Sequence, residues 1–241
     1  MINEQLNFVE AHSIQDAWRE VMWLCVKNGY DFVVKGGSYV GQIRKQLRDV
    51  HIRILEPGKR PLAPIMPPGI VGPTSDEKID AYFQRYLFSG EKAENEQYTY
   101  GEYIVAQWER VVELLNQSQG NTNQACIAIG DVHTTSLGDP PCLRLISLKC
   151  VGGQLVMTVF FRSWDLFAGF PENLGGLQVL KELLLTCLTF PCTDGPIIAY
   201  SDGLHIYEQY FGIVDSLNID KVKVGEQALS EKQKYALEHG V

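Results

Sequence analysis

The sequence predicts an α+β domain in which a mixed sheet is flanked by helices. The chain has 241 residues, of which 45% are hydrophobic and 21% charged, a composition typical of a globular protein with a buried core. Helical periods and short strand-like apolar runs are interleaved irregularly, which favours mixed α and β structure over a doubly wound sheet. No break in composition divides the chain, so residues 1–241 are expected to form a single domain.

The first half of the chain begins with an amphipathic helix. This helix is expected over residues 12–29, with Ser13 as its N-cap, Asp16 three residues later and Gly29 at its end. Four further segments are expected before residue 120: strands within 31–55 around a Gly36-Gly37 turn, a loop over the proline-rich residues 57–73, a helix over 75–89 capped by Ser75, and a helix over 99–117.

The second half is dominated by apolar runs of strand type. Residues 174–190 are the exception, because their length and apolar character predict a central helix that is buried on most sides. The remaining segments are strands over 125–130, 143–150, 154–162 and 196–201, a strand or helix over 202–215, and a polar tail over 229–239 that is helical or frayed.

Charge and cysteine content narrow the classes of function. The net charge of −8 argues against a nucleic-acid partner, although a few basic residues can still hold one phosphate. The amino terminus lacks an apolar signal core, and the apolar run over 180–190 is interrupted by Lys181 and Glu182, so neither export nor a membrane span is expected. The six cysteines form no CxxC pair. We therefore expect a cytoplasmic protein with reduced thiols and no metal.

Cys142 is the first candidate for chemistry. It ends the run Asp139-Pro140-Pro141-Cys142, in which a rigid turn leads into a strand and can aim a thiol into a cavity. A nearby cation would favour its thiolate. Taken alone, the run fits a half-buried, unreactive structural cysteine better, because such cysteines are common.

A second candidate segment runs from Arg162 to Asn173. Arg162 and Ser163 suit a phosphate, because a guanidinium and a hydroxyl both donate hydrogen bonds. Asn173 offers a donor and an acceptor side by side, which can read an amide-like ring. The alternative is structural: Asp165 pairs with Arg162, and Asn173 caps the helix expected from Leu174.

Two weaker candidates are His205 with Tyr207 and the pair Tyr100-Gly101. His205 and Tyr207 are two residues apart, so on a strand their side chains share a face and could bind a sugar hydroxyl. Either pair alone also fits ordinary surface residues. Tyr100 begins the helix expected over 99–117.

Together these motifs resemble the thymidylate synthase family. That family shows Pro-Cys, then about twenty residues later Arg-Ser-x-Asp-x-x-x-Gly-x-Pro-x-Asn, then Asp-x-x-His-x-Tyr. Here the interval from Cys142 to Arg162 is twenty residues. The resemblance covers a motif-bearing core at residues 99–211, whereas residues 1–95 form a divergent amino-terminal part. It implies the thymidylate synthase-like fold and a homodimer that pairs through a sheet face, to which the runs at 125–130 and 154–161 are suited.

The resemblance implies a role for each motif residue. Cys142 would add to C6 of a pyrimidine nucleoside monophosphate, and Arg162 with Ser163 would hold its phosphate. Asn173 would bind the edge of the base, and His205 and Tyr207 would bind the ribose hydroxyl. Asp165 would bind a reduced pterin, and Tyr100 would hold the water that removes the C5 proton. The pterin would be 5,10-methylene-tetrahydrofolate or methylene-tetrahydromethanopterin.

The amino-terminal part departs from the family pattern. The usual arginine pair about twenty residues before the cysteine is absent from 121–126, and Leu143 replaces the usual histidine. Lys35, which begins a glycine-rich run, or Arg44 or Arg144 could meet the phosphate instead. That run also fits a plain hairpin turn. Glu56 is a candidate for the family's active-site glutamate.

Three functions follow from the resemblance. The first is a thymidylate synthase that converts dUMP to dTMP, with the pterin giving a methylene and a hydride. The second is a hydroxymethyltransferase acting on dUMP, dCMP or CMP, in which water takes the place of hydride. The third is a nucleotide-binding relative without catalysis, for which Cys142 would have no use.

Overall fold

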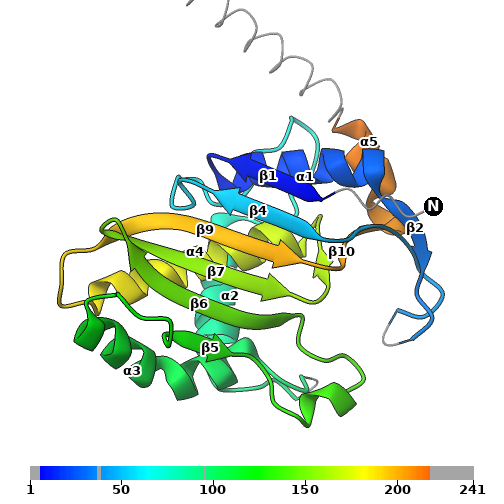
Figure 1. The fold of residues 1–241 in the computed structure, drawn as a ribbon. Helices are drawn as coiled ribbons and strands as arrows, with labels where there is room; N and C mark the ends of the chain where they lie inside the picture. Colours follow the sequence, from blue (N-terminus) through cyan, green and yellow to red (C-terminus); the bar gives the residue numbers. More distant parts are fainter. Residues whose placement is uncertain (1–5, 37–38, 95, 218–241) are drawn as a thin grey trace, which may run out of the picture.

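The computed structural model describes residues 6–36, 39–94 and 96–217 (Figure 1). The strands are β1 (Asn7–Ala11), β2 (Tyr30–Val33), β3 (Ile43–Leu47), β4 (Val50–Ile54), β5 (Cys126–Ala128), β6 (Leu143–Val151), β7 (Gln154–Phe161), β8 (Trp164–Asp165), β9 (Thr193–Ser201) and β10 (Leu204–Tyr207). The α-helices are α1 (Ile14–Asn28), α2 (Asp76–Tyr82), α3 (Tyr100–Ser118), α4 (Gly169–Thr186) and α5 (Phe211–Ser216). A π-helical turn at Phe83–Leu87 continues α2, and 3₁₀ turns lie at Thr134–Ser136 and Glu208–Tyr210.

The larger sheet is mixed and has helices on one face. Its order is β1-β4-β9-β7-β6-β5, with parallel pairing of β1 with β4 and of β7 with β9. In Figure 1 this sheet lies in front of α1, α2 and α4, and its near face carries no helix. Residues of β7 and β9 alternate between fully buried and half-buried, because only the helical side faces the core. This arrangement confirms the α+β class and the mixed, helix-flanked sheet.

A smaller sheet brings the candidate residues into register. Its order is β2-β3-β10-β8, so strands from both halves of the chain meet in it. His205 on β10 lies between Gln46 on β3 and Asp165 on β8, and Tyr207 lies opposite Arg44. Residues two apart on a strand share a face. Asp165, His205, Tyr207 and Arg44 therefore stand on one face of this sheet.

The structure confirms the predicted starts of the helices that begin with a capping residue. Ser13 caps α1 and forms a reciprocal capping box with Asp16, and Gly29 follows the last turn. Ser75 caps α2 and Thr99 caps α3. The indole N–H of Trp18 on α1 also donates to the Leu166 carbonyl at 2.9 Å and to the next carbonyl at 3.1 Å, which ties α1 to the segment before α4.

Three parts of the secondary structure differ from the prediction. The helix expected over 174–190 runs from Gly169 to Thr186, because Pro171 sits in its first turn, where a missing N–H is tolerated. Strand β1 was not predicted, since it is short and outside any clear apolar run. Residues 202–215 hold a strand followed by helical turns. The polar tail at 229–239 and Gly37 of the expected turn lie outside the described residues.

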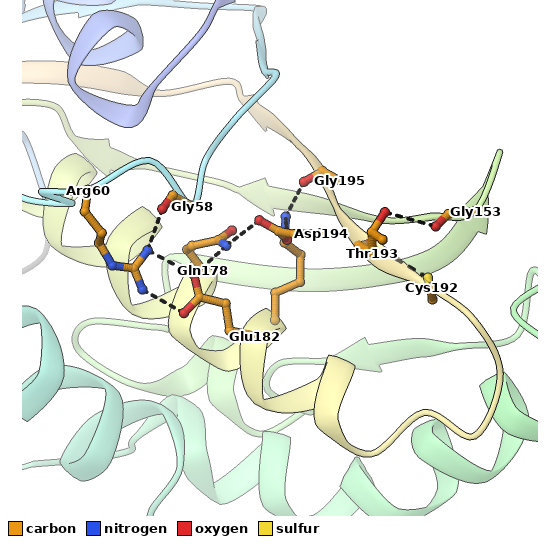
Figure 2. Close-up of polar contacts among 10 residues, drawn as sticks. Gly58, Arg60, Gly153, Gln178, Glu182, Cys192, Thr193, Asp194 and Gly195 are labelled. Carbon is orange, nitrogen blue, oxygen red and sulfur yellow. Dashed lines mark hydrogen bonds and ion pairs between the residues drawn. The ribbon is translucent and has the colours of Figure 1, made fainter.

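A polar network holds α4 against β9 and the proline-rich loop (Figure 2). Arg60 of the loop pairs with Glu182 of α4 at 2.7 Å, and Gln178 donates to Asp194 at 2.8 Å. Lys181 is fully buried in α4 and pairs with Asp194 at 3.0 Å. A buried charge needs a partner, so the pairing of Lys181 with Asp194 fixes the rotation of α4 about its axis.

No helix among the described residues has the length and apolarity to cross a bilayer.

Candidate active site

Arg162 anchors the segment that carries Cys142. Its backbone N–H donates to the Cys142 carbonyl oxygen at 2.9 Å, directly before β6. Its guanidinium folds over the turn, where Nε donates to the Pro141 carbonyl at 3.1 Å and Nη2 donates to that of Pro140. The side chain remains 38% exposed, so its guanidinium can still meet an anion.

Tyr100 holds the same segment from the other side. Its hydroxyl oxygen accepts a hydrogen bond from the backbone N–H of Leu143 at 3.2 Å. Burial raises the pKa of Tyr100 far above its usual value, so the hydroxyl stays protonated and can donate as well. Gly101 fits here for a steric reason, because a Cβ at this position would lie 2.0 Å from the Ser89 carbonyl oxygen. The Tyr-Gly pair thus places a phenol beside the backbone that follows Cys142.

The Cys142 thiol is protonated in this state. Burial raises its pKa above the usual 9.0, and Asp139 raises it further. Arg162, Arg44 and Arg144 act in the opposite direction. Arg162 therefore does favour the thiolate, as expected from the sequence, but burial outweighs it.

Asp165 and Arg162 do not pair, so the structural alternative offered for them is wrong. Arg162 lies 3.4 Å from Asp139 instead. Asp165 accepts the backbone N–H of Phe167 at 3.0 Å and of Ala168 at 3.5 Å, which turns the chain into α4. Burial raises the pKa of Asp165, whereas these N–H groups lower it.

Asn173 is not the cap of α4, because it lies inside the helix, in its second turn. Its Oδ1 accepts the indole N–H of Trp164 at 3.0 Å, and its Nδ2 donates to the Tyr82 hydroxyl at 2.9 Å. Asn173 is half-buried at the side of the helix that faces β8 and α2. Its amide is held from two sides.

His205 presents one free ring nitrogen. Its Nδ1 lies 2.9 Å from the Gly203 carbonyl, which can only accept, so Nδ1 carries the proton. Burial lowers the pKa of His205 to about 4, which keeps the ring neutral. Its Nε2 is buried and has no partner among the described residues, so it can accept a hydrogen bond from a hydroxyl.

Arg44 is the cation that the smaller sheet brings to the site. Its guanidinium carbon lies 4.8 Å from the ring centroid of Tyr207, and its Nε is buried without a partner in the described part of the chain. Burial raises the pKa of Tyr207, whereas the charge of Arg44 lowers it.

Three other predicted site residues are Lys35, Glu56 and Ser163. Lys35 is exposed in the segment after β2, and Glu56 is exposed just beyond β4. Ser163 is half-buried between Arg162 and Trp164. Of the cations considered for the phosphate, Arg44 shares a sheet face with His205 and Asp165, whereas Lys35 lies outside both sheets.

Sequence reasoning missed an aromatic wall formed by Tyr82, Tyr86, Tyr98 and Tyr100. Tyr86 packs on Tyr82 with ring centroids 5.5 Å apart and on Tyr100 at 5.1 Å, and Tyr98 lies 5.9 Å from Tyr100. Tyr82 and Tyr86 line a cavity of about 570 Å³ that Glu172 of α4 also borders. The signal was present in the sequence: Tyr82 and Tyr86 are four apart and share a helix face. Such a flat aromatic surface can stack on a planar ring.

No group of three or more His, Cys, Asp or Glu side chains among the described residues is arranged to hold a metal.

No family model matches the chain. A curated protein of Methanosarcina acetivorans named "Putative thymidylate synthase" is 25% identical over 215 residues, covering 87% of this chain and 93% of the relative. A protein of the same name from Methanosarcina barkeri is 28% identical over 218 residues, with the same coverage.

A solved structure supports the fold independently. The crystal structure of thymidylate synthase from T4 phage superposes with a TM-score of 0.63, over 83% of this chain and 80% of that one. The sequence identity is 14%, so this likeness establishes the fold alone. The resemblance inferred from the motifs is thus confirmed, and the chain has the thymidylate synthase fold.

Proposed function

We propose that this chain is a thymidylate synthase, which methylates C5 of dUMP through a covalent bond between Cys142 and C6. The observation that carries the proposal is the anchoring of the segment around Cys142: Arg162 binds the two carbonyls before it, and Tyr100 binds the amide after it. A structural cysteine would need no cationic neighbour, whereas the charge of Arg162 lowers the pKa of Cys142.

The binding groups match the parts of a nucleotide. Arg162, Arg44 and Ser163 would hold the phosphate, with Arg44 in place of the arginine pair that is missing at 121–126. His205 would accept the ribose hydroxyl at its free Nε2, with Tyr207 beside it. Asn173 would bind the edge of the base.

The chemical steps are assigned to residues of this chain. The Cys142 thiol loses its proton to solvent, its thiolate adds to C6, and the electron pair moves to C5 and O4 as an enolate. Carbon C5 then bonds to the one-carbon unit, whose bond to the pterin nitrogen breaks once the C5 proton has left, and hydride transfer to that carbon completes the methyl group. Tyr100 holds the water that takes the C5 proton, and Cys142 leaves by elimination at the end. A reduced methylene pterin, bound against Asp165 and the tyrosine wall, supplies the methylene group and a hydride.

A hydroxymethyltransferase is the second candidate function. It shares every step up to loss of the C5 proton, after which water adds in place of hydride. The cavity beside Tyr82 and Tyr86 favours it, because exposed residues such as Arg85 and Glu91 line the cavity and admit water.

Product mass separates the two functions. The protein is incubated with dUMP, dCMP or CMP and with methylene-tetrahydrofolate or methylene-tetrahydromethanopterin. Methylated dUMP supports the synthase, and a hydroxymethylated nucleotide supports the alternative. Absence of product in every combination, with nucleotide binding retained, would indicate the non-catalytic relative.

Cys142→Ser tests the mechanism. We expect turnover to fall by about 10³-fold or more, because a hydroxyl is a far weaker nucleophile at neutral pH, while the dissociation constant of dUMP stays within about threefold. Cys126→Ser is the matched control, since this half-buried thiol lies on β5, away from the turn. Normal turnover in Cys142→Ser would refute the covalent mechanism.

A further inference from the structure

The Asn173 amide has two partners, and only one of them selects its orientation. The Tyr82 hydroxyl, 2.9 Å from Nδ2, can accept or donate, so it suits either end of the amide. The Trp164 indole N–H can only donate, and it lies 3.0 Å from Oδ1. A flipped amide would set an NH₂ group against the indole N–H and leave the buried indole without an acceptor.

Trp164 cannot turn away to relieve such a clash. Its side chain is 2% exposed and stacks on Phe161, with ring centroids 4.0 Å apart and planes within 6°. Phe170 packs at 4.6 Å, and the Trp164 backbone N–H donates to the Gly203 carbonyl at 3.0 Å. The indole is therefore a fixed donor.

Each end of the Asn173 amide can form one further hydrogen bond. Oδ1 has a second lone pair and Nδ2 has a second hydrogen, so the amide can still bind a ring edge. Uracil presents a donor at N3 and an acceptor at position 4, whereas cytosine presents an acceptor at N3 and a donor at position 4. A freely flipping amide matches both bases, and a fixed amide matches one.

We propose that Trp164 acts through Asn173 as a specificity-determining residue, fixing the amide so that the site accepts uracil nucleotides and rejects cytosine nucleotides. This inference rests on the proposed function, which places a pyrimidine edge at Asn173. Trp164 touches no substrate in this scheme and acts as a positioning residue.

The test is the ratio of dissociation constants for dUMP and dCMP, or for UMP and CMP, measured by calorimetry. The wild-type protein is expected to prefer the uracil nucleotide by about 30-fold or more, since the wrong base leaves buried polar groups unpaired. In Trp164→Phe, which keeps an aromatic ring but lacks the N–H, the ratio is expected to fall to within about threefold. Trp164→Met is the second variant, because methionine also packs well between aromatic rings.

Tyr82→Phe is the control. The Tyr82 hydroxyl is compatible with either orientation of the Asn173 amide. Its loss is therefore expected to weaken binding of both bases and to preserve the ratio of their dissociation constants. Circular dichroism melting verifies that each variant is folded. A ratio unchanged in the folded Trp164 variants, or lost equally in Tyr82→Phe, overturns the inference while the proposed function stands. A wild-type protein that binds neither nucleotide refutes the proposed function itself.

Discussion

His205 illustrates how burial and one carbonyl define the state of a single side chain. The ring is neutral because burial lowers its pKa to about 4, and the Gly203 carbonyl fixes the proton on Nδ1. In an unfolded chain the same ring titrates near 6.5. Between these two values the unfolded state binds more protons than the folded state, so acid favours unfolding.

The pH dependence of the free energy of unfolding tests whether His205 is neutral in the folded state. We expect the free energy of unfolding to fall by about 2 kcal/mol between about pH 7.5 and pH 5 on account of His205 alone, with no further change above about pH 7.5. Asp165 acts in the opposite direction, because its pKa is raised. The measurement is therefore the difference in urea unfolding between wild type and His205→Gln, with the exposed His133→Gln as control. Parallel pH profiles for wild type and His205→Gln would contradict the assignment.

At the residue scale, spacing in the sequence was enough to single out most of the candidate site residues. Cys142, Arg162 and His205 carry enough pattern in one dimension to be found without a structure. Arg44 was less certain, because its place depends on pairing between β3 and β10, which are far apart in the chain. Tyr82 was missed because an aromatic side chain on an amphipathic helix fits a plain core position just as well.

At the element scale, helices α2 and α4 pack unusually closely. Gly175 and Gly176 of α4 face α2, and a Cβ at 176 would lie 2.6 Å from Cδ1 of Tyr82 and 2.9 Å from Cδ1 of Leu87. This close approach lets the Tyr82 hydroxyl reach Asn173. The sequence predicted both helices, but it could not give their separation, which depends on side chains from two distant segments.

Gly176→Ala tests this packing. The added methyl group should destabilise the protein by about 1–3 kcal/mol and lower turnover, because α2 must move and Tyr82 then loses Asn173. Thermal unfolding and the dUMP assay measure the two effects. Gly212→Ala in α5 is the matched control, since no atom lies within 4 Å of the position its Cβ would take. Equal stability of Gly176→Ala and wild type would mean that the helices do not meet as described.

At the scale of the whole molecule, both sheets draw strands from the full length of the described chain. Strand β4 lies between β1 and β9, and β3 lies beside β10. The segment 99–211 on its own would leave β9 and β10 without these neighbours. We therefore propose that residues 1–241 act as one domain, although the amino-terminal part looks divergent in sequence.

The helix-free face of the larger sheet is the proposed homodimer surface. Half-buried apolar side chains gather on it, including Val156, Phe160 and Ile198, and Phe160 stacks on Tyr200 at 5.2 Å. A second copy of the chain would cover them.

Sedimentation velocity tests this surface. Wild type should sediment as a dimer and Ile198→Lys as a monomer, because burying an unpaired lysine in the interface is unfavourable. Val105→Lys, on the exposed side of α3, should remain dimeric. A wild type that sediments as a single chain would rule the homodimer out.

The anchoring of Cys142 also bears on how such proteins diverge. Arg162 and Tyr100 hold the segment around Cys142 through the carbonyls of two prolines and the amide of Leu143, all of them main-chain atoms. Every residue type supplies a carbonyl, and every type except proline supplies an amide hydrogen. These anchors do not use the side chain after the cysteine, so they hold the turn with leucine at position 143, where the resemblance implies histidine. The tyrosine-glycine pair and the arginine twenty residues on are therefore the features of this chain that fix the cysteine.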